Sequence, residues 1–137
     1  MAEETLVKET LTEEMIAAGA ELTRRLDCAA WPLAASLWIF DPELNQWRLI
    51  LASSVVKEKG PLEAYRHVSN TLAESNLKLP FFSISAVSPD DPLIRGLLSA
   101  YGTGAEIEGR RIYRSAVKGH FVDDAYVYRL MSVAPAA

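Results

Sequence analysis

The sequence predicts an α+β domain in which about three helices pack against a mostly antiparallel sheet of about five strands. Apolar residues recur at helical spacing in three segments, and five other segments are short runs of strand-forming residues. Turn-forming residues join two pairs of these runs into hairpins. The expected order is helix, strand, strand, helix, strand, helix, strand, strand, which does not suit a doubly wound parallel fold.

Length and charge narrow the class of protein further. A chain of 137 residues fits one domain, which we expect over residues 10–132, between a flexible N-terminal segment 1–9 and a flexible tail 133–137. The net charge of −4 disfavours nucleic acid and anionic lipid as partners. A lone cysteine, Cys28, cannot form an internal disulfide, and the acidic N-terminus lacks a signal-peptide pattern. No run is long enough to span a membrane, so we expect a cytoplasmic protein.

The first helix is predicted from about Leu11 to Asp27. Thr10 and Glu13 have the spacing of a capping box, in which two side chains satisfy free backbone amides at a helix start. Apolar residues then recur at every third or fourth position, as one buried helix face requires. Acidic residues near the start and arginines near the end match the helix dipole.

A β-hairpin follows from about Ala35 to Ser53. Its two apolar runs are separated by Asp-Pro-Glu-Leu-Asn, in which Pro42 pre-sets a turn and Asn45 tolerates a positive φ. Strand alternation places Trp38 on one face and its neighbours on the other, yet both faces of both strands are largely apolar. Neither face of the hairpin is therefore suited to exposure to solvent.

This two-sided apolar hairpin predicts a cover on each face. Helices of the same chain can supply it, and so can a second copy across a two-fold axis. Trp38 and Trp47 are the large aromatic residues that commonly anchor such contacts. We expect cover by the chain's own helices together with a homodimer or another protein partner.

The remaining elements follow from local signals. Gly60-Pro61 opens a second helix that fades near Asn76, and Phe82 alternates with serines to begin a one-sided strand through Ala86. Asp90 or Asp91 caps a short helix that starts at Pro92 and stops at Gly102. A final hairpin pairs Arg111–Val117 with a strand over residues 125–130.

Residues 22–54 carry a family resemblance. A helix leading into SLWIFDPELNQWRLILAS resembles the opening helix and hairpin of GAF or roadblock-type, profilin-like domains. The resemblance covers about a quarter of the chain and implies a ligand-sensing or dimerising platform, although the GAF signature of Asn, Lys, Phe, Asp and Glu is absent. The whole chain also resembles a small bacterial family that ends in a similar Asp-Asp-Ala-Tyr-x-Tyr-Arg-Leu strand, which implies no activity.

One candidate catalytic group lies before the third helix. Asp90, followed by Glu106, Glu108 and Arg110, has a spacing similar to the Asp and Glu-x-Lys of restriction endonucleases, where two carboxylates hold a divalent metal. Arginine stands where lysine is needed and does not release a proton at ordinary pH. Asp90, together with Asp91 and Pro92, is also fully explained as the start of a helix.

A second candidate group is His120 with Asp123 and Asp124. An imidazole and two carboxylates within five residues suit a metal or acid–base chemistry in principle. Successive strand residues point to opposite faces, so both carboxylates join the imidazole only if the backbone bulges. We favour a polar turn or bulge leading into the last strand, and we expect no metal and no cofactor.

A basic strip is predicted on the fourth strand. Arg110, Arg111 and Arg114, with Tyr113 between them, combine charges and a stacking ring as backbone-binding strips do. Asp123 and Asp124 are close enough in the hairpin pattern to neutralise it as cross-strand pairs. Our default interpretation is that these cations protect an edge strand from unwanted pairing.

These observations rank three functions. The leading one is a non-enzymatic regulatory or protein-interaction module, because interface-type aromatics are plentiful and no catalytic set is convincing. The first alternative is a small-molecule sensor with a pocket lined by tyrosines, namely Tyr65, Tyr101, Tyr113 or Tyr126. The second is a metal-dependent hydrolase or nuclease that uses the acidic groups above.

Overall fold

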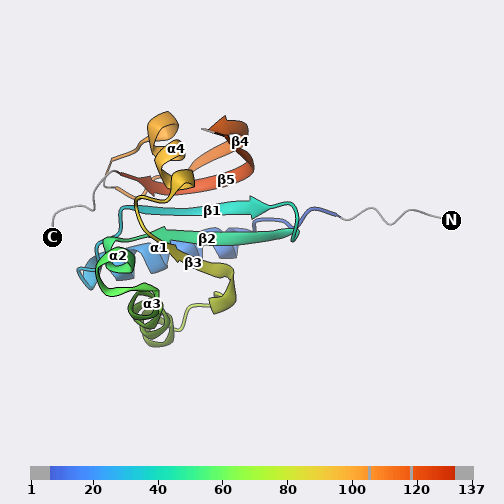
Figure 1. Cartoon of the computed structure of the whole chain (residues 1–137). Coiled ribbons are helices and arrows are strands. Elements are labelled where there is room, and N and C mark those ends of the chain that lie inside the picture. The colour runs from blue at the N-terminus through green and yellow to red at the C-terminus, as the bar shows by residue number, and fades with distance from the viewer. Residues whose placement is uncertain (1–6, 105, 118, 132–137) are drawn as a thin grey trace.

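The computed structural model describes residues 7–104, 106–117 and 119–131, and Figure 1 shows the arrangement of its elements. In chain order these are α1 (Glu13–Cys28), β1 (Ala35–Asp41), β2 (Gln46–Ala52), α2 (Ser54–Lys59), α3 (Pro61–Ser75), the 3-10 turn η1 (Phe81–Ser83), β3 (Ile84–Val87), α4 (Pro92–Tyr101), β4 (Arg110–Val117) and β5 (His120–Leu130). The α+β class and the mostly antiparallel five-stranded sheet are confirmed, with one more α-helix than predicted.

The sheet has the strand order β3-β2-β1-β5-β4. Every neighbouring pair is antiparallel except β2 and β3, which run parallel. Helices α1 and α3 lie on one side of the sheet and α4 lies on the other (Figure 1). The core is accordingly split into two layers, one on each face.

The predicted hairpin is present, and both of its faces are covered within the chain. Phe40 pairs with Trp47, and the side chain of Asp41 accepts a hydrogen bond from the Glu43 amide to shape the turn. Asn45 has a φ of 49°, as the turn prediction required. Trp38 and Trp47 are 1% and 4% exposed, beneath the α1 and α3 side of the core. The chain's own helices therefore bury this apolar hairpin without a second copy.

Several predicted boundaries were wrong for local reasons. The cap of α1 is Thr12, whose hydroxyl accepts from the Met15 amide, so Thr10 and Glu13 do not form a capping box. Ser53 is not a simple strand end but caps α2 by accepting from the Val55 amide. That cap starts a short helix that the sequence did not predict, and Gly60 at φ 90° separates it from α3.

A β-bulge in β5 fixes the centre of the core. Ser36 pairs with Arg129 and Leu37 with Val127, so Tyr128 is an extra residue in its strand. Its buried hydroxyl accepts from Trp38 Nε1 at 3.0 Å and donates to the Ile16 carbonyl of α1. Burial raises the pKa of Tyr128, which keeps the phenol neutral and able to make both bonds.

A second long-range contact ties the end of α1 to β5. Arg129 is buried, and its two terminal nitrogens donate to the two carboxylate oxygens of Asp27 at 2.9 and 2.7 Å. One of these nitrogens also donates to the Leu33 carbonyl. This bidentate ion pair joins residues that are 102 positions apart in the chain.

Candidate functional site

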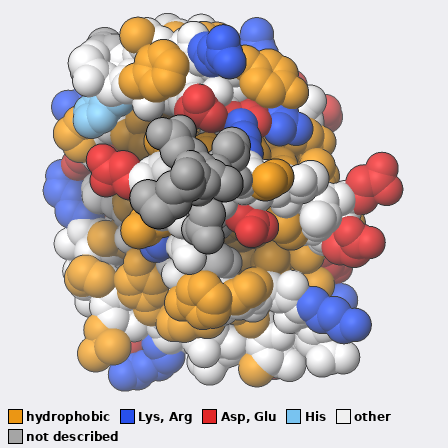
Figure 2. All heavy atoms as spheres, turned by 90° about the vertical axis from the view of Figure 1, so that its right-hand side faces the viewer, with side chains coloured by type: hydrophobic (Ala, Val, Ile, Leu, Met, Phe, Trp, Pro, Cys, Tyr) orange, Lys and Arg blue, Asp and Glu red, His pale blue; other side chains and the backbone are white. Residues whose placement is uncertain are grey.

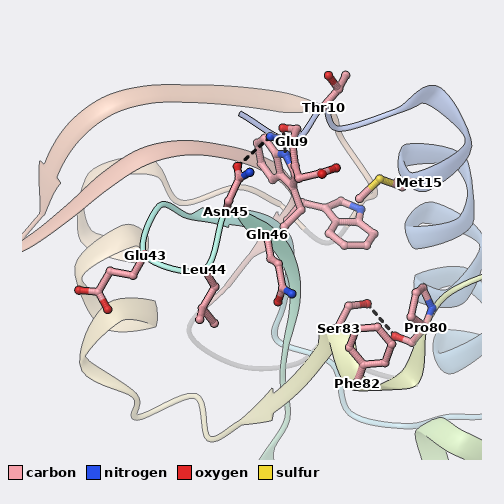
Figure 3. Close-up of a pocket in the computed structure, with 12 residues that line it drawn as sticks. Glu9, Thr10, Met15, Glu43, Leu44, Asn45, Gln46, Pro80, Phe82 and Ser83 are labelled. Atoms are coloured by element: carbon pink, nitrogen blue, oxygen red, sulfur yellow. Dashed lines mark hydrogen bonds between the residues drawn. The ribbon is translucent and has the colours of Figure 1, made fainter. Parts of the chain in front are cut away.

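A hollow of about 630 Å³ opens at the turn end of the β1–β2 hairpin, and we call it the hairpin-end pocket. Its apolar lining consists of Met15, Trp38, Leu44, Trp47, Pro80 and Phe82. Its polar lining consists of Glu9, Thr10, Glu43, Asn45, Gln46 and Ser83. Figure 3 shows these residues arriving from three separate parts of the chain, the N-terminal segment with α1, the hairpin turn and the turn before β3.

Both tryptophans of the pocket are held in place from behind. Trp38 donates its indole N–H to Tyr128, and Trp47 donates its indole N–H to the Glu9 carbonyl at 2.8 Å. A buried indole whose N–H has a hydrogen-bond partner is held in one orientation. Both rings are therefore fixed in the wall of the pocket.

The turn before β3 supplies exposed aromatic surface. The Ser83 amide and hydroxyl both donate to the Pro80 carbonyl, which closes η1 and turns the chain before the strand starts. Phe82 is consequently 74% exposed, so the prediction that it begins a one-sided strand was wrong. Figure 2 looks onto this end of the molecule and shows hydrophobic side chains gathered over its lower half.

The N-terminal segment forms another wall of the pocket. The Asn45 side-chain oxygen accepts from the Glu9 amide at 2.9 Å, and its nitrogen donates to the Val7 carbonyl at 3.0 Å. The side-chain amide of Asn45 thus makes one accepted and one donated hydrogen bond to the backbone of residues 7 and 9, as a neighbouring strand would. Residues 7–9 are anchored to the hairpin, whereas the flexible segment was predicted to reach residue 9; residues 1–6 lie outside the described residues.

Beside the pocket, Lys8 and Arg111 share the buried carboxylate of Asp124. Arg111 donates to both oxygens at 2.7 and 2.8 Å, and the Lys8 ammonium lies 2.9 Å from one of them. Burial alone would raise the pKa of Asp124, but these two cations outweigh it and lower that pKa below its ordinary value. The same two cations lie over the ring of Trp47 at 5.7 and 5.4 Å.

Replacing Asp124 with asparagine is expected to lower the free energy of unfolding by about 1–2 kcal/mol at pH 7, because three charge-assisted hydrogen bonds are weakened or lost. The lowered pKa of Asp124 means that its contribution is present above the unfolded-state value and is lost as pH falls through the folded-state value. Urea unfolding at pH 7 and pH 3 measures the gap between wild type and variant, which shrinks at the lower pH.

Asp123→Asn is the matched control, because the Asp123 carboxylate forms an ion pair with Lys8 on the surface and its side chain is 32% exposed. Its unfolding free energy is expected to stay close to that of the wild type at both pH values. An equal loss in the two variants would contradict a specific role for Asp124 in holding the N-terminal segment.

The structure places the predicted basic strip on the free edge of the sheet. The cross-strand pairing of Arg111 with Asp124 is present, and the Arg111 guanidinium also lies over the Tyr113 ring. Arg110 lies over the Tyr101 ring instead. Arg114 is exposed and has a φ of 41°, a conformation that bends β4 and hinders pairing with another strand.

The other predicted site residues are not gathered into one place. Asp90 is exposed and forms an ion pair with Lys57 at 2.8 Å, which lowers the pKa of Asp90. His120 is exposed at the first position of β5, so the last strand starts there and not after a polar turn. In the described ranges, no three His, Cys, Asp or Glu side chains come together in a way that would hold a metal ion.

Sequence reasoning missed most of the pocket. Trp38 and Trp47 were predicted as binding residues and do line it, but the four tyrosines expected around a ligand do not. Tyr65 instead accepts from the Ala86 amide on the outer edge of β3. The available signal was the position of Phe81 and Phe82 directly after Pro80, because proline commonly marks a turn or a break in regular structure.

No protein-family model, no curated protein and no solved structure is found to match this chain. Over the part of the chain that the structure describes, no helix is both long and apolar enough to cross a bilayer. The candidate site is interpreted from its own geometry.

Proposed function

We propose that this protein is a non-enzymatic protein-interaction module that uses the hairpin-end pocket to hold a side chain of its partner. The observation that carries the proposal is a hollow lined by two anchored tryptophans and bordered by exposed apolar side chains. Hot spots of protein interfaces combine these features, with a buried aromatic centre and apolar surroundings that exclude water.

The border of the pocket favours a protein over a small molecule. Leu44 and Phe82 are 57% and 74% exposed at its rim, and Phe81 continues the apolar surface beyond it. A small ligand inside the hollow would leave this surface in water. A partner protein would cover the pocket and its border together, which gains more from apolar burial.

The charged groups support a non-enzymatic role. Asp124, the most buried of the candidate catalytic carboxylates, already binds Lys8 and Arg111. Its lowered pKa suits a permanent ion pair and not a group that exchanges protons near neutral pH. His120 is exposed on a different part of the sheet edge, paired across the turn with Val117.

Site-specific photocrosslinking in the native host tests the proposal. A photoreactive residue at Leu44 is expected to give one discrete crosslinked species, and Trp47→Ala in the same chain is expected to reduce it strongly. The control position is Leu62 on α3, which is an equally apolar residue and is 75% exposed away from the pocket lining. Equal crosslinking from both positions, or none from Leu44, would contradict the proposal. A crosslink to a second copy of the chain would identify the partner as a homodimer.

A small-molecule sensor is the second candidate, and the volume of the pocket favours it. About 630 Å³ lies in the range of small-ligand sites. A thermal-shift screen with metabolites distinguishes the two functions, because a true ligand raises the melting temperature in proportion to the logarithm of its concentration once the site is saturated. Loss of that shift in Trp47→Ala would place the ligand in the pocket.

A further inference from the structure

Resting on the proposed function, we infer that the side chain held in the hairpin-end pocket is basic, and that the partner presents an arginine or a lysine there. The inference combines the charge of the lining, the chemistry of its rings and an arrangement of the same kind elsewhere in the chain. It specifies the chemical class of the partner's anchor residue.

The lining carries negative charge and no positive charge. Glu9 and Glu43 are its ionisable residues, and no lysine or arginine lines the hollow. Neither carboxylate forms an ion pair within the described residues. Glu9 lies at the same side of the pocket as Met15, whereas Glu43 points outward (Figure 3). Glu9 is therefore the expected direct counter-charge, and Glu43 adds a longer-range attraction.

The whole chain has a net charge of −4, although Lys8 and Arg111 lie beside the pocket, where both contact Asp124. An acidic protein attracts a basic partner during diffusional encounter and speeds association, most strongly at low salt. The net charge of the chain and the lining of the pocket thus favour the same class of anchor.

The rings supply the second half of the recognition. Indole faces attract cations more strongly than other aromatic side chains do, and a guanidinium also stacks flat against them. Phe82 offers a ring that is 74% exposed, while Trp38 and Trp47 line the hollow with 1% and 4% of their surface exposed. The methylene stem of a basic side chain would at the same time cover Met15 and Pro80, which an acidic or amide side chain is too short to do.

The chain already contains this combination of groups next to the pocket. Lys8 lies over the rings of Phe40 and Trp47 at 4.7 and 5.7 Å while its ammonium contacts the carboxylate of Asp124. Arg111 does the same over Trp47 at 5.4 Å. Trp47 lines both this charged cluster and the hairpin-end pocket, but only the pocket lacks a cation of its own.

Fluorescence anisotropy with two labelled peptides and one competitor tests the inference on the full chain. The first peptide is a fluorescein-labelled nonapeptide with a central Leu-Ser-Arg-Ser-Leu sequence, and the second has citrulline, the neutral isostere, in place of arginine. The competitor is unlabelled N-acetylarginine amide, which is titrated against the bound arginine peptide. We expect the arginine peptide to bind at least about tenfold more tightly than the citrulline peptide, with a difference that narrows as salt rises.

Matched variants locate the effect. Glu9→Gln combined with Glu43→Gln is expected to remove the preference for arginine, so that the two peptides bind this variant with equal affinity. Glu9 holds Trp47 through its backbone carbonyl, so the pocket keeps its shape in this variant. Glu58→Gln, an exposed residue of α2 that does not line the pocket, is the control and should retain the preference.

Three outcomes would overturn the inference. Equal binding of the two peptides, lost in Trp47→Ala, would reject a basic anchor but leave the proposed interaction module standing. Binding of neither peptide at millimolar concentration would also reject it, while the crosslinking from Leu44 judges the proposed function separately. N-acetylarginine amide competing as well as the peptide would show that the ligand is a small cation and not a partner's side chain.

Discussion

Gly19→Ala is expected to lower the free energy of unfolding by about 2–3 kcal/mol, although alanine is the better helix former. A Cβ atom at this position of α1 would lie 2.5 Å from the Tyr128 hydroxyl and 2.7 Å from Trp38 Nε1. Both of those side chains are fully buried and are hydrogen-bonded to each other, so neither moves away without losing that bond. Urea unfolding at pH 7 measures the loss.

Two further variants separate this clash from a general effect of glycine replacement. Gly104→Ala is expected to be nearly neutral, because nothing lies within 4 Å of the added Cβ atom. Tyr128→Phe removes the clashing hydroxyl, so the double variant Gly19→Ala, Tyr128→Phe should lose less stability than the sum of the two single losses. Strict additivity would contradict the close approach of α1 to Tyr128.

Asp27→Ala is expected to cost about 3 kcal/mol or more, because it removes the carboxylate that faces a buried guanidinium. The Arg129 side chain is 3% exposed and donates two charge-assisted hydrogen bonds to Asp27. These bonds offset part of the cost of removing the guanidinium from water. Without that carboxylate the desolvation of the guanidinium is poorly offset, and the end of α1 is no longer tied to β5. Thermal and urea unfolding both report the change.

The control for this prediction lies on the same helix. Glu21 pairs with Arg24 and Arg25 on the exposed surface, and Glu21→Gln should change stability very little. A loss of similar size in the two variants would show that the burial of the Arg129 guanidinium does not matter. Asp27→Asn should fall between wild type and Asp27→Ala, since an amide still accepts a hydrogen bond.

Local sequence patterns predicted the helices, strands and turns, because the formation of these elements depends largely on residues that are close in the chain. The Asp-Pro turn and the positive φ of Asn45 followed from turn chemistry, and the alternation of β1 and β2 placed the correct residues on each face. Where the prediction failed, another local group competed. Thr12 replaced Thr10 as the cap of α1, and Ser53 started a helix where a strand end was expected.

Long-range contacts were the part that sequence reasoning missed. Nothing near Asp27 indicates that its partner is Arg129, and nothing near Gly19 indicates that Tyr128 lies against it. The bulge that turns Tyr128 into the core depends on the pairing of β5 with β1, which requires knowledge of the strand order. The exception is Arg111 with Asp124, because both belong to one predicted hairpin.

Predicting the pocket requires both local patterns and long-range contacts. Trp38 and Trp47 were expected to bind a partner because the hairpin is apolar on both faces, and burial by α1 and α3 removes that reason. Their role in the pocket depends on Phe82, which leaves the predicted strand, and on Glu9, which the prediction assigned to a flexible segment. The surface for a partner is thus the end of the hairpin and not its faces.

The measurement that tests this claim most directly is amide hydrogen exchange on the chain, free and saturated with the partner identified through Leu44. We expect slower exchange at the hairpin turn, residues 42–46, and at the turn over residues 80–83, with no change along the outer edge of β4 or on α3. Slower exchange on the β4 edge or on α3, with the hairpin turn unchanged, would contradict it.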